Sequence, residues 1–266
     1  MYKRMHKIKK LQKGNFHDIE DIILIERPIT IKINENPVVS IICLPKDLKE
    51  LTIGFLFTTG FIDSINEIKN IEVNSIENEV SIIVDDSNKA AIENFNSLTY
   101  NRIIKTSCGI PSIWRDLILN SIDKPEEQFN DIKLTSGLIF KSIIKMQKET
   151  SLFKETGGCH GAALFDFQGK LLEIFEDIGR HNAIDKVIGS ALIKNIELKE
   201  TFLCSTGRLT GDSVLKAARS KIPILASISA PIESGIRIAF NYNITLIGFV
   251  RGSKMNIYTH PDRIVI

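Results

Sequence analysis

The sequence predicts a mixed α/β protein, in which a smaller β-rich α+β half precedes a layered α/β half. In residues 22–43, short β-branched runs are separated by turn residues, as is typical of neighbouring strands. From about residue 135 onward, segments of strand length alternate with segments of helical periodicity, which favours a layered α/β domain. We therefore expect a basic flexible tail (residues 1–20), a β-rich domain (21–134) and an α/β domain (135–266).

The first half is expected to contain one well-defined helix among its strands. This helix runs from about Asp47 to Thr59, because apolar side chains repeat there with helical spacing; Asp47 is the expected N-cap and Gly60 the expected stop. A loop of small residues at 105–111 carries Cys108, and a short helix follows at 112–121. The expected strands cover residues 22–25, 29–33, 38–43, 71–73, 80–84 and 98–104.

The second half begins with a long helix that reaches from Thr135 or Ser136 to about Lys148. Two strands that flank a turn at 168–170 come next. Because parallel strands place ligand-binding loops at their carboxyl ends, the residues after each strand are the first place to seek a site. The strands are expected at residues 162–167, 171–175, 201–205, 222–229, 245–250 and 256–258, and the helices at 183–192, 210–220 and 231–241.

Composition and charge exclude several classes of protein. Hydrophobic residues make up 43% of the chain and charged residues 25%, which is ordinary for a globular protein. A net charge of +2 is too balanced for a general nucleic-acid or membrane partner. No apolar segment follows the basic N-terminus as in a signal peptide, and residues 238–250 are too short to span a bilayer. The scattered cysteines indicate a reducing compartment and no structural zinc, so we expect a cytoplasmic protein.

Four loops combine glycine with basic or small polar residues and are suited to anions. Adjacent glycines let a backbone approach a ligand closely, and a helix N-terminus favours negative charge. Taken alone, the Gly-Gly pair also fits a plain turn, and residues 176–182 also fit a solvated loop. Together the loops favour a large, multiply charged ligand. The candidate binding residues are Gly157, Gly158, His160, Arg180, His181, Gly207, Arg208, Phe249, Val250, Arg251, Gly252, Ser253 and Lys254.

Cys108 is the candidate nucleophile. Lys105 and the start of the expected helix at residue 112 both lie close to it in the sequence, and positive charge lowers the pKa of a thiol. Cys43 and Cys204 fall within apolar strands and are expected to pack in the core. Cys159 is a weaker rival because His160 follows it. The alternative for Cys108 is that it also packs.

These segments together resemble the FdhD family, the formate dehydrogenase accessory sulfurtransferases. The long string Glu176-Asp177-Ile178-Gly179-Arg180-His181-Asn182-Ala183-Ile184-Asp185-Lys186 is the most specific part of the resemblance. The other matching segments are residues 26–28, 44–48, 53–56, 107–109, 156–160, 206–208, 229–231, 249–254 and 258–260.

The resemblance implies a homodimer whose larger domain is similar to the cytidine-deaminase fold. It implies that a cysteine desulfurase supplies persulfide sulfur, which passes to bound molybdenum bis(molybdopterin guanine dinucleotide) for insertion into formate dehydrogenase, with no tightly held metal of the protein's own. The persulfide-carrying position of the family maps onto Cys108, and the cofactor-binding segment maps onto residues 249–254. A guanine-nucleotide-type ligand follows from this cargo.

One departure from the family pattern concerns the loop of Cys108. The family carries C-G-x-C, whereas this chain has Pro111 at the second cysteine position. An internal disulfide cannot form there, so Cys108 works with an outside thiol or the protein binds the cofactor without transferring sulfur. A zinc deaminase shares the implied fold, but the H-x-E and P-C-x-x-C zinc signature is absent from the chain.

Overall fold

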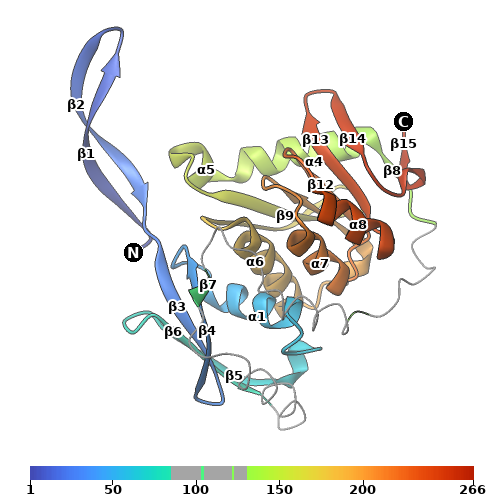
Figure 1. Ribbon diagram of the computed structural model, residues 1–266, viewed down its shortest axis with the longest axis horizontal. Coiled ribbons are helices and arrows are strands. Elements are labelled where there is room, and N and C mark those ends of the chain that lie inside the picture. Colours follow the sequence, from blue (N-terminus) through green and yellow to red (C-terminus); the bar gives the residue numbers. More distant parts are fainter. Residues whose placement is uncertain (85–102, 105–121, 123–130) are drawn as a thin grey trace.

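The computed structural model describes residues 1–84, 103–104, 122 and 131–266. Two β-sheets make up the body, with helices between them and on the outer face of the second sheet, and a long β-hairpin projects from the body (Figure 1). Cys108, Pro111 and the helix expected at 112–121 lie outside the described residues. None of the helices in the described ranges is long and apolar enough to cross a membrane.

The first sheet has five strands in the order β5-β6-β3-β4-β7. Most of the strands expected in this half are therefore present; of the strand expected at 98–104, the described part is β7. The helix α1 also forms as expected, but Asp47 is in the left-handed conformation (φ 56°) and its side chain makes no capping hydrogen bond. The bounds are β3 Arg27–Ile33, β4 Asn36–Cys43, α1 Leu48–Thr58, the 3-10 helix η1 Ile65–Glu67, β5 Ile68–Asn74, β6 Glu79–Val84 and β7 Ile103–Ile104.

The second sheet has six strands in the order β10-β9-β11-β12-β13-β14. It is mixed: β11, β12 and β13 are parallel to one another, while the remaining neighbours are antiparallel. Its strands are β9 His160–Asp166, β10 Leu171–Asp177, β11 Thr201–Ser205, β12 Ile224–Ser227, β13 Thr245–Arg251 and β14 Lys254–Ile257. A short parallel pair, β8 Leu134–Thr135 and β15 Ile264–Val265, and the 3-10 helices η4 Leu198–Glu200 and η5 Pro261–Arg263 complete this half.

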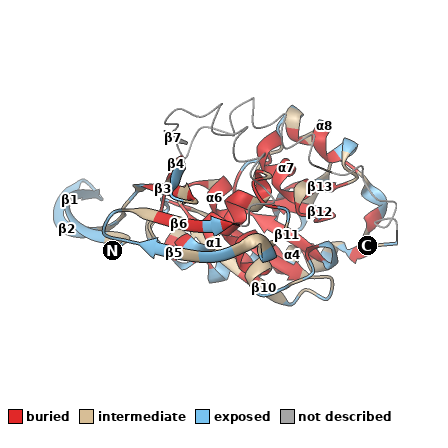
Figure 2. Ribbon diagram, turned by 90° about the horizontal axis from the view of Figure 1, so that it is seen from below, coloured by how far each residue is buried: buried red, intermediate tan, exposed pale blue. Residues whose placement is uncertain are grey.

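Helices cover both faces of the second sheet. They are α4 Ser136–Glu149, α5 Ser151–Thr156, α6 Arg180–Ile193, α7 Gly211–Arg219 and α8 Glu233–Asn241. Thr135 accepts a hydrogen bond from the backbone N–H of Leu138 and so caps α4, whereas α8 begins two residues after Pro231, its expected start. Alternate strand residues face opposite sides: Leu164 and Leu203 pack toward α6 and α7, while Phe165 and Phe202 pack toward α4. Figure 2 shows that the most deeply buried elements include the central strands β11 and β12 of this sheet and the helices α6 and α7.

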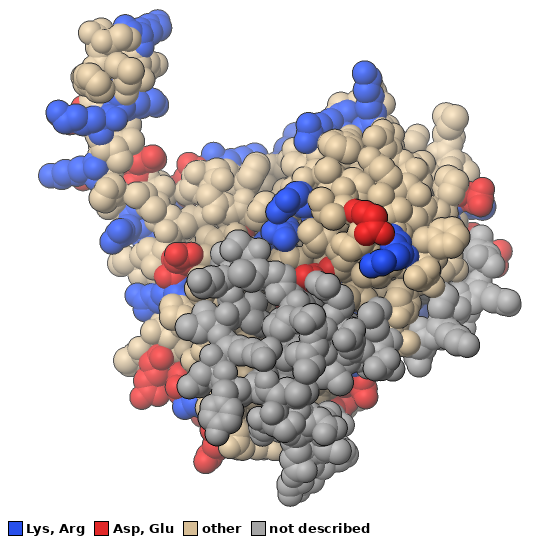
Figure 3. Space-filling view, in the orientation of Figure 1, with Lys and Arg blue, Asp and Glu red and all other residues tan. Residues whose placement is uncertain are grey.

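The N-terminal segment is a β-hairpin, which corrects the prediction of a flexible tail at residues 1–20. β1 (Lys3–Gln12) pairs antiparallel with β2 (Asn15–Leu24), and Figure 3 shows its Lys and Arg side chains along the projecting arm. The turn residues Lys13 and Gly14 both have positive φ, which is the geometry of a tight hairpin turn. The pairing places basic residues of β1 opposite acidic residues of β2, such as Lys7 opposite Glu20 and Lys9 opposite Asp18.

The helix α1 ties the two halves together by packing closely on α6. A Cβ atom on Gly54 would lie 1.8 Å from the carbonyl oxygen of Asp185, and one on Gly189 would lie 1.9 Å from that of Glu50. The two backbones can therefore approach this closely because both helices carry glycine at the crossing. The hydrophobic cluster is continuous from the first sheet through this crossing to the second, across the boundary expected at residues 134–135.

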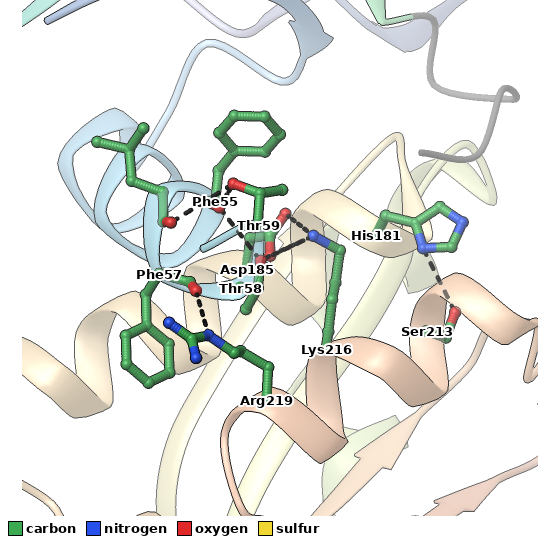
Figure 4. Close-up of polar contacts among 10 residues, drawn as sticks. Phe55, Phe57, Thr58, Thr59, His181, Asp185, Ser213, Lys216 and Arg219 are labelled. Atoms are coloured by element: carbon green, nitrogen blue, oxygen red, sulfur yellow. Dashed lines mark hydrogen bonds and ion pairs between the residues drawn. The ribbon is translucent and has the colours of Figure 1, made fainter. Parts of the chain in front are cut away.

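A buried ion pair reinforces the same junction (Figure 4). Lys216 of α7 donates hydrogen bonds of 2.7 and 2.8 Å to the carboxylate of Asp185 in α6 and one of 3.0 Å to the hydroxyl of Thr58 in α1. Thr58 in turn donates to Asp185 at 2.8 Å. The two charged side chains are 2% exposed, so each is held in the core by the other.

Replacing Gly54 with Ala is expected to lower the free energy of unfolding by at least about 2 kcal/mol, because the added methyl group must push the helices apart. Gly137 in α4 is the matched control: no atom lies within 4 Å of the position that a Cβ would take there, so Gly137→Ala should stabilise slightly, by about 0.5 kcal/mol. Chemical denaturation of both variants measures the difference. Equal stability of Gly54→Ala and the wild type would contradict the close crossing.

Candidate functional site

The four predicted anion loops lie at one edge of the second sheet, because β13, which leads into residues 249–254, runs parallel to β11 and β12. β9 begins there and β10 ends there, since His160 pairs with Asp177 in the antiparallel register. The parallel strands β11 and β12 end at the same edge, where Ser205 is opposite Ser227. Segments far apart in the sequence are therefore brought together by the strand order, as the carboxyl-end rule for such sheets predicts.

Hydrogen bonds of Thr206 link the start of β9 to the loop after β11. Its hydroxyl lies 3.2 Å from Nδ1 of His160 and accepts a 3.0 Å hydrogen bond from the backbone N–H of Gly161. The backbone N–H of Thr206 also donates to the carbonyl of Gly161 at 3.0 Å. His160 is thus held in a defined orientation beside the loop that carries Gly207 and Arg208.

Gly207 allows the side chain of Arg180 to lie directly against the backbone. A Cβ atom at Gly207 would be 2.6 Å from Cβ of Arg180. Two serines hold this glycine in place: its N–H donates to Oγ of Ser205 at 3.1 Å, and Oγ of Ser227 donates to its carbonyl at 2.7 Å. Because the contact leaves no room for a side chain, residue 207 must be glycine for Arg180 to reach this position.

Two nitrogen atoms at this edge are buried without a hydrogen-bond partner among the described residues: Nε of Arg180 and Nε2 of His181. Both residues belong to the first turn of α6, whose N-cap is Gly179. Buried polar atoms are normally paired, so each unpaired one calls for an explanation. A helix N-terminus with unpaired side-chain nitrogens is the arrangement that an anion would complete.

The basic groups of this cluster also disfavour one another's charge. Burial, together with Arg180 and Arg208, lowers the pKa of His160, although Asp177 opposes the shift. Burial lowers the pKa of His181 well below its usual value, and Arg180, Lys216 and His160 lower it further. Burial and Arg208 lower the pKa of Arg180, while Asp212 raises it. A bound anion would relieve this excess of positive charge.

The remaining residues of the 176–186 string stabilise the fold. Asp177 and Lys186 form a 2.7 Å ion pair in which both side chains are fully buried. Asp177 also accepts hydrogen bonds from the backbone N–H groups of Leu44 and Gly179 and from the side chain of Asn182. This network joins the end of β10 to the segment that follows β4, and it fixes where α6 begins.

Two predicted segments lie at this edge but make no described hydrogen bond to Arg180 or His181. Gly157 and Gly158 are exposed, and the backbone N–H of Gly158 donates to the hydroxyl of Thr156 at 3.1 Å. Residues 249–254 span the end of β13, the turn at 252–253 and the start of β14, and Phe249 and Gly252 have positive φ. In this segment the Nε–H of Arg251 donates to the carbonyl of Ile228, whereas Phe249, Gly252, Ser253 and Lys254 are exposed; Val250 packs in the core.

The three described cysteines are held as thiols. Burial raises the pKa of Cys43 and Cys204, and both side chains are part of the core. Burial and the neighbouring Glu176 raise the pKa of Cys159 to about 12. Its sulfur lies 3.7 Å from Glu176, while the imidazole of His160 contacts Thr206, so the pair predicted as a weak rival dyad is not formed. Within the described ranges, no three His, Cys, Asp or Glu side chains gather where they could hold a metal ion.

Hydroxyl side chains that the sequence did not indicate organise the site. Thr206, Ser213 and Ser227 each contact a predicted residue or its backbone. Small hydroxyl residues directly after a strand, or in the first turn of the next helix, are the signal that could have identified them. The signal is weak because the same residues are common in ordinary turns and caps.

Comparison with known proteins decides the family. The sequence model of the FdhD/NarQ family matches residues 24–265, which is nearly the whole chain. The chain belongs to this family. Family membership confirms the resemblance deduced from the motifs.

Relatives within the FdhD/NarQ family match from end to end. The chain is 37% identical over 262 residues to the sulfur carrier protein FdhD of Sulfolobus acidocaldarius, covering 98% of both chains. It is 33% identical over 256 residues to the protein of the same name from Bacillus subtilis, covering 96% of this chain and 95% of the relative. A crystal structure from Desulfotalea psychrophila, described as a candidate formate dehydrogenase accessory protein, superposes with a TM-score of 0.80 at 29% identity and full coverage of both chains.

The proximity of Arg180 should affect the pKa of His160. In Arg180→Met, which keeps an aliphatic side chain against Gly207, the neighbouring cation is gone and protonated His160 is less disfavoured, so its pKa should rise. Titration of the imidazole signals by NMR measures this shift. Arg4→Met on the projecting hairpin is the control and should leave His160 unchanged. A pKa of His160 that stays the same or falls in Arg180→Met would show that the two groups do not interact.

Proposed function

We propose that this protein carries sulfur on Cys108 and delivers it to molybdenum bis(molybdopterin guanine dinucleotide), bound as substrate, for the activation of formate dehydrogenase. A cysteine desulfurase would supply the sulfur as a persulfide. Membership of the FdhD/NarQ family and the names of its relatives support a sulfur-carrier role. The name of the similar crystal structure supports a link to formate dehydrogenase.

The observation that carries the proposal is the cluster of basic groups at the start of α6. Arg180 and His181 each hold a buried nitrogen without a partner among the described residues, and the loops of His160 and Arg208 lie beside them. The proposed cargo contains several phosphates, which guanidinium groups and helix N-termini bind well. The segment at 249–254, with exposed Arg251 and Lys254, is suited to a second part of such a large ligand.

The chemistry assigned to Cys108 is thiol–persulfide exchange. Its thiolate attacks the terminal sulfur of the desulfurase persulfide; the new S–S bond forms while the old one breaks, and the desulfurase leaves as a thiolate. Because residue 111 is proline, an outside thiolate then attacks Sγ of Cys108 and forms a mixed disulfide with it. The terminal sulfur departs to molybdenum as sulfide, having gained the two electrons that the two thiol sulfurs lose.

The proposal extends to the surroundings of this reaction. We place the protein in the cytoplasm as a homodimer, with residues 135–266 similar to the cytidine-deaminase fold and without a nucleic-acid or membrane partner. The reducing conditions there suit scattered, unpaired cysteines.

Pro111 favours one alternative, a cofactor-binding chaperone that has lost sulfur transfer. Such a protein would use the same basic cluster and need no nucleophile. The two functions differ in whether Cys108 is required, and the following variants separate them.

Cys108→Ser is expected to abolish activation of formate dehydrogenase, because a hydroxyl cannot carry a sulfane sulfur. Formate dehydrogenase activity is measured in cells that lack the native protein and express the variant. Pro111→Cys should keep or raise activity, since an internal resolving thiol speeds release of sulfur. Cys204→Ala, which changes a buried core thiol, serves as the control and should preserve activity with a modest loss of stability. Full activation of formate dehydrogenase by Cys108→Ser would contradict sulfur transfer through Cys108 and favour the chaperone function.

A further inference from the structure

Ser213 connects the first turn of α7 to the basic cluster. Its side chain is 1% exposed, and its hydroxyl oxygen lies 3.4 Å from Nδ1 of His181 (Figure 4). The same oxygen lies 3.2 Å from the hydroxyl of Thr210, the N-cap of α7, and 3.5 Å from the carbonyl oxygen of Arg208, which is a second acceptor for the serine proton. One serine hydroxyl therefore contacts both the imidazole and the loop that carries Arg208.

His181 occupies a position that forces a choice between two neutral forms. It is 8% exposed, and among the described residues Nδ1 contacts Ser213 while Nε2 is buried without a partner. Burial and the nearby Arg180, Lys216 and His160 lower the pKa of the ring and keep it uncharged near neutral pH. A neutral imidazole has one N–H and one lone pair, so the hydrogen bond at Nδ1 determines what Nε2 presents.

We propose that Ser213 is a positioning residue: it donates its proton to Nδ1 of His181, so that Nε2 carries a hydrogen and acts as a donor to a phosphate group of the ligand. The hydroxyl of Thr210 then donates to Ser213, which completes a chain of three groups. The identity of the ligand rests on the proposed function, whereas the state of the imidazole does not.

The Ser213 hydroxyl has one proton and two acceptors within reach, Nδ1 of His181 at 3.4 Å and the carbonyl of Arg208 at 3.5 Å. The chemistry of the surrounding groups favours donation to Nδ1. Nε of Arg180 is an N–H donor and, like Nε2 of His181, is buried and unpaired among the described residues. Two donors in the first turn of one helix can serve one anion, whereas a lone pair at Nε2 would repel it. In the opposite tautomer Nε2 has no hydrogen, so His181 could not donate a hydrogen bond to an anion at the start of α6.

Nitrogen-15 NMR of histidine-labelled full-length protein near neutral pH reads the tautomer directly, and a His181→Gln variant assigns the signals. In the wild type, His181 is expected to be the Nε2–H tautomer. In Ser213→Ala, the bond at Nδ1 is lost and the Nδ1–H tautomer should become populated. Ser220→Ala is the matched control at the end of the same helix, because Oγ of Ser220 is buried but has no partner in the described part of the chain, so its removal should leave His181 unchanged.

Calorimetry with GDP tests the consequence for binding. Ser213→Ala should weaken binding about fivefold, the loss expected for one neutral hydrogen bond of about 1 kcal/mol, while Ser220→Ala should bind as the wild type does. Arg208→Ala tests the ligand itself: if the wild type does not bind GDP, or binds it as Arg208→Ala does, the proposed ligand is wrong, and the NMR spectra still decide the role of Ser213.

An Nδ1–H tautomer or a charged ring in the wild type would overturn the role of Ser213, even if Ser213→Ala failed to fold. So would a Ser213→Ala spectrum in which His181 keeps the wild-type tautomer. A change of tautomer in Ser220→Ala of the same size as in Ser213→Ala would overturn it as well, because the effect would then be a general response to loss of a hydroxyl in α7.

Discussion

The close crossing of α1 and α6 determines how the two halves of the chain are joined. Gly54 and Gly189 let the two backbones meet, and the Asp185–Lys216 pair with Thr58 holds α1, α6 and α7 together in the core. Removing one partner of such a buried pair costs about 3–5 kcal/mol, because the other charge stays buried and unpaired. The first half of the chain is therefore attached to the second through side chains that tolerate little change.

This junction also sets the position of the basic cluster. α6 is held along its length by α1 and at its start by the Asp177–Lys186 pair, so its first turn is fixed at the edge of the second sheet. Arg180 and His181 project from that turn, and the loop after β11 meets them through Gly207. Because this helix terminus is held in place, its hydrogen-bond donors are already positioned before a ligand binds. This preorganisation reduces the conformational entropy that is lost on binding.

The apolar pattern predicted most elements of the fold because burial produces it; β11 has the predicted bounds, and α4 differs by about one residue. It could not predict the β1–β2 hairpin, because strands that pair through exposed, charged residues show no regular alternation of apolar and polar residues in the sequence. The 176–186 string shows the corresponding limit for the site. A sequence does not distinguish the carboxylate of Asp177, paired in the core, from the guanidinium of Arg180, which faces the cluster; strand order and burial make that distinction.

Mass spectrometry of the peptide that contains Cys108 shows whether sulfur passes through this residue. The full-length protein is incubated with a cysteine desulfurase and cysteine and then digested without reductant. We expect one added sulfur atom on the peptide that contains Cys108, removable by a mild thiol, and none on the peptides of Cys43, Cys159 and Cys204, whose thiols are buried. No added sulfur on Cys108, or sulfur on one of the buried cysteines instead, would contradict it.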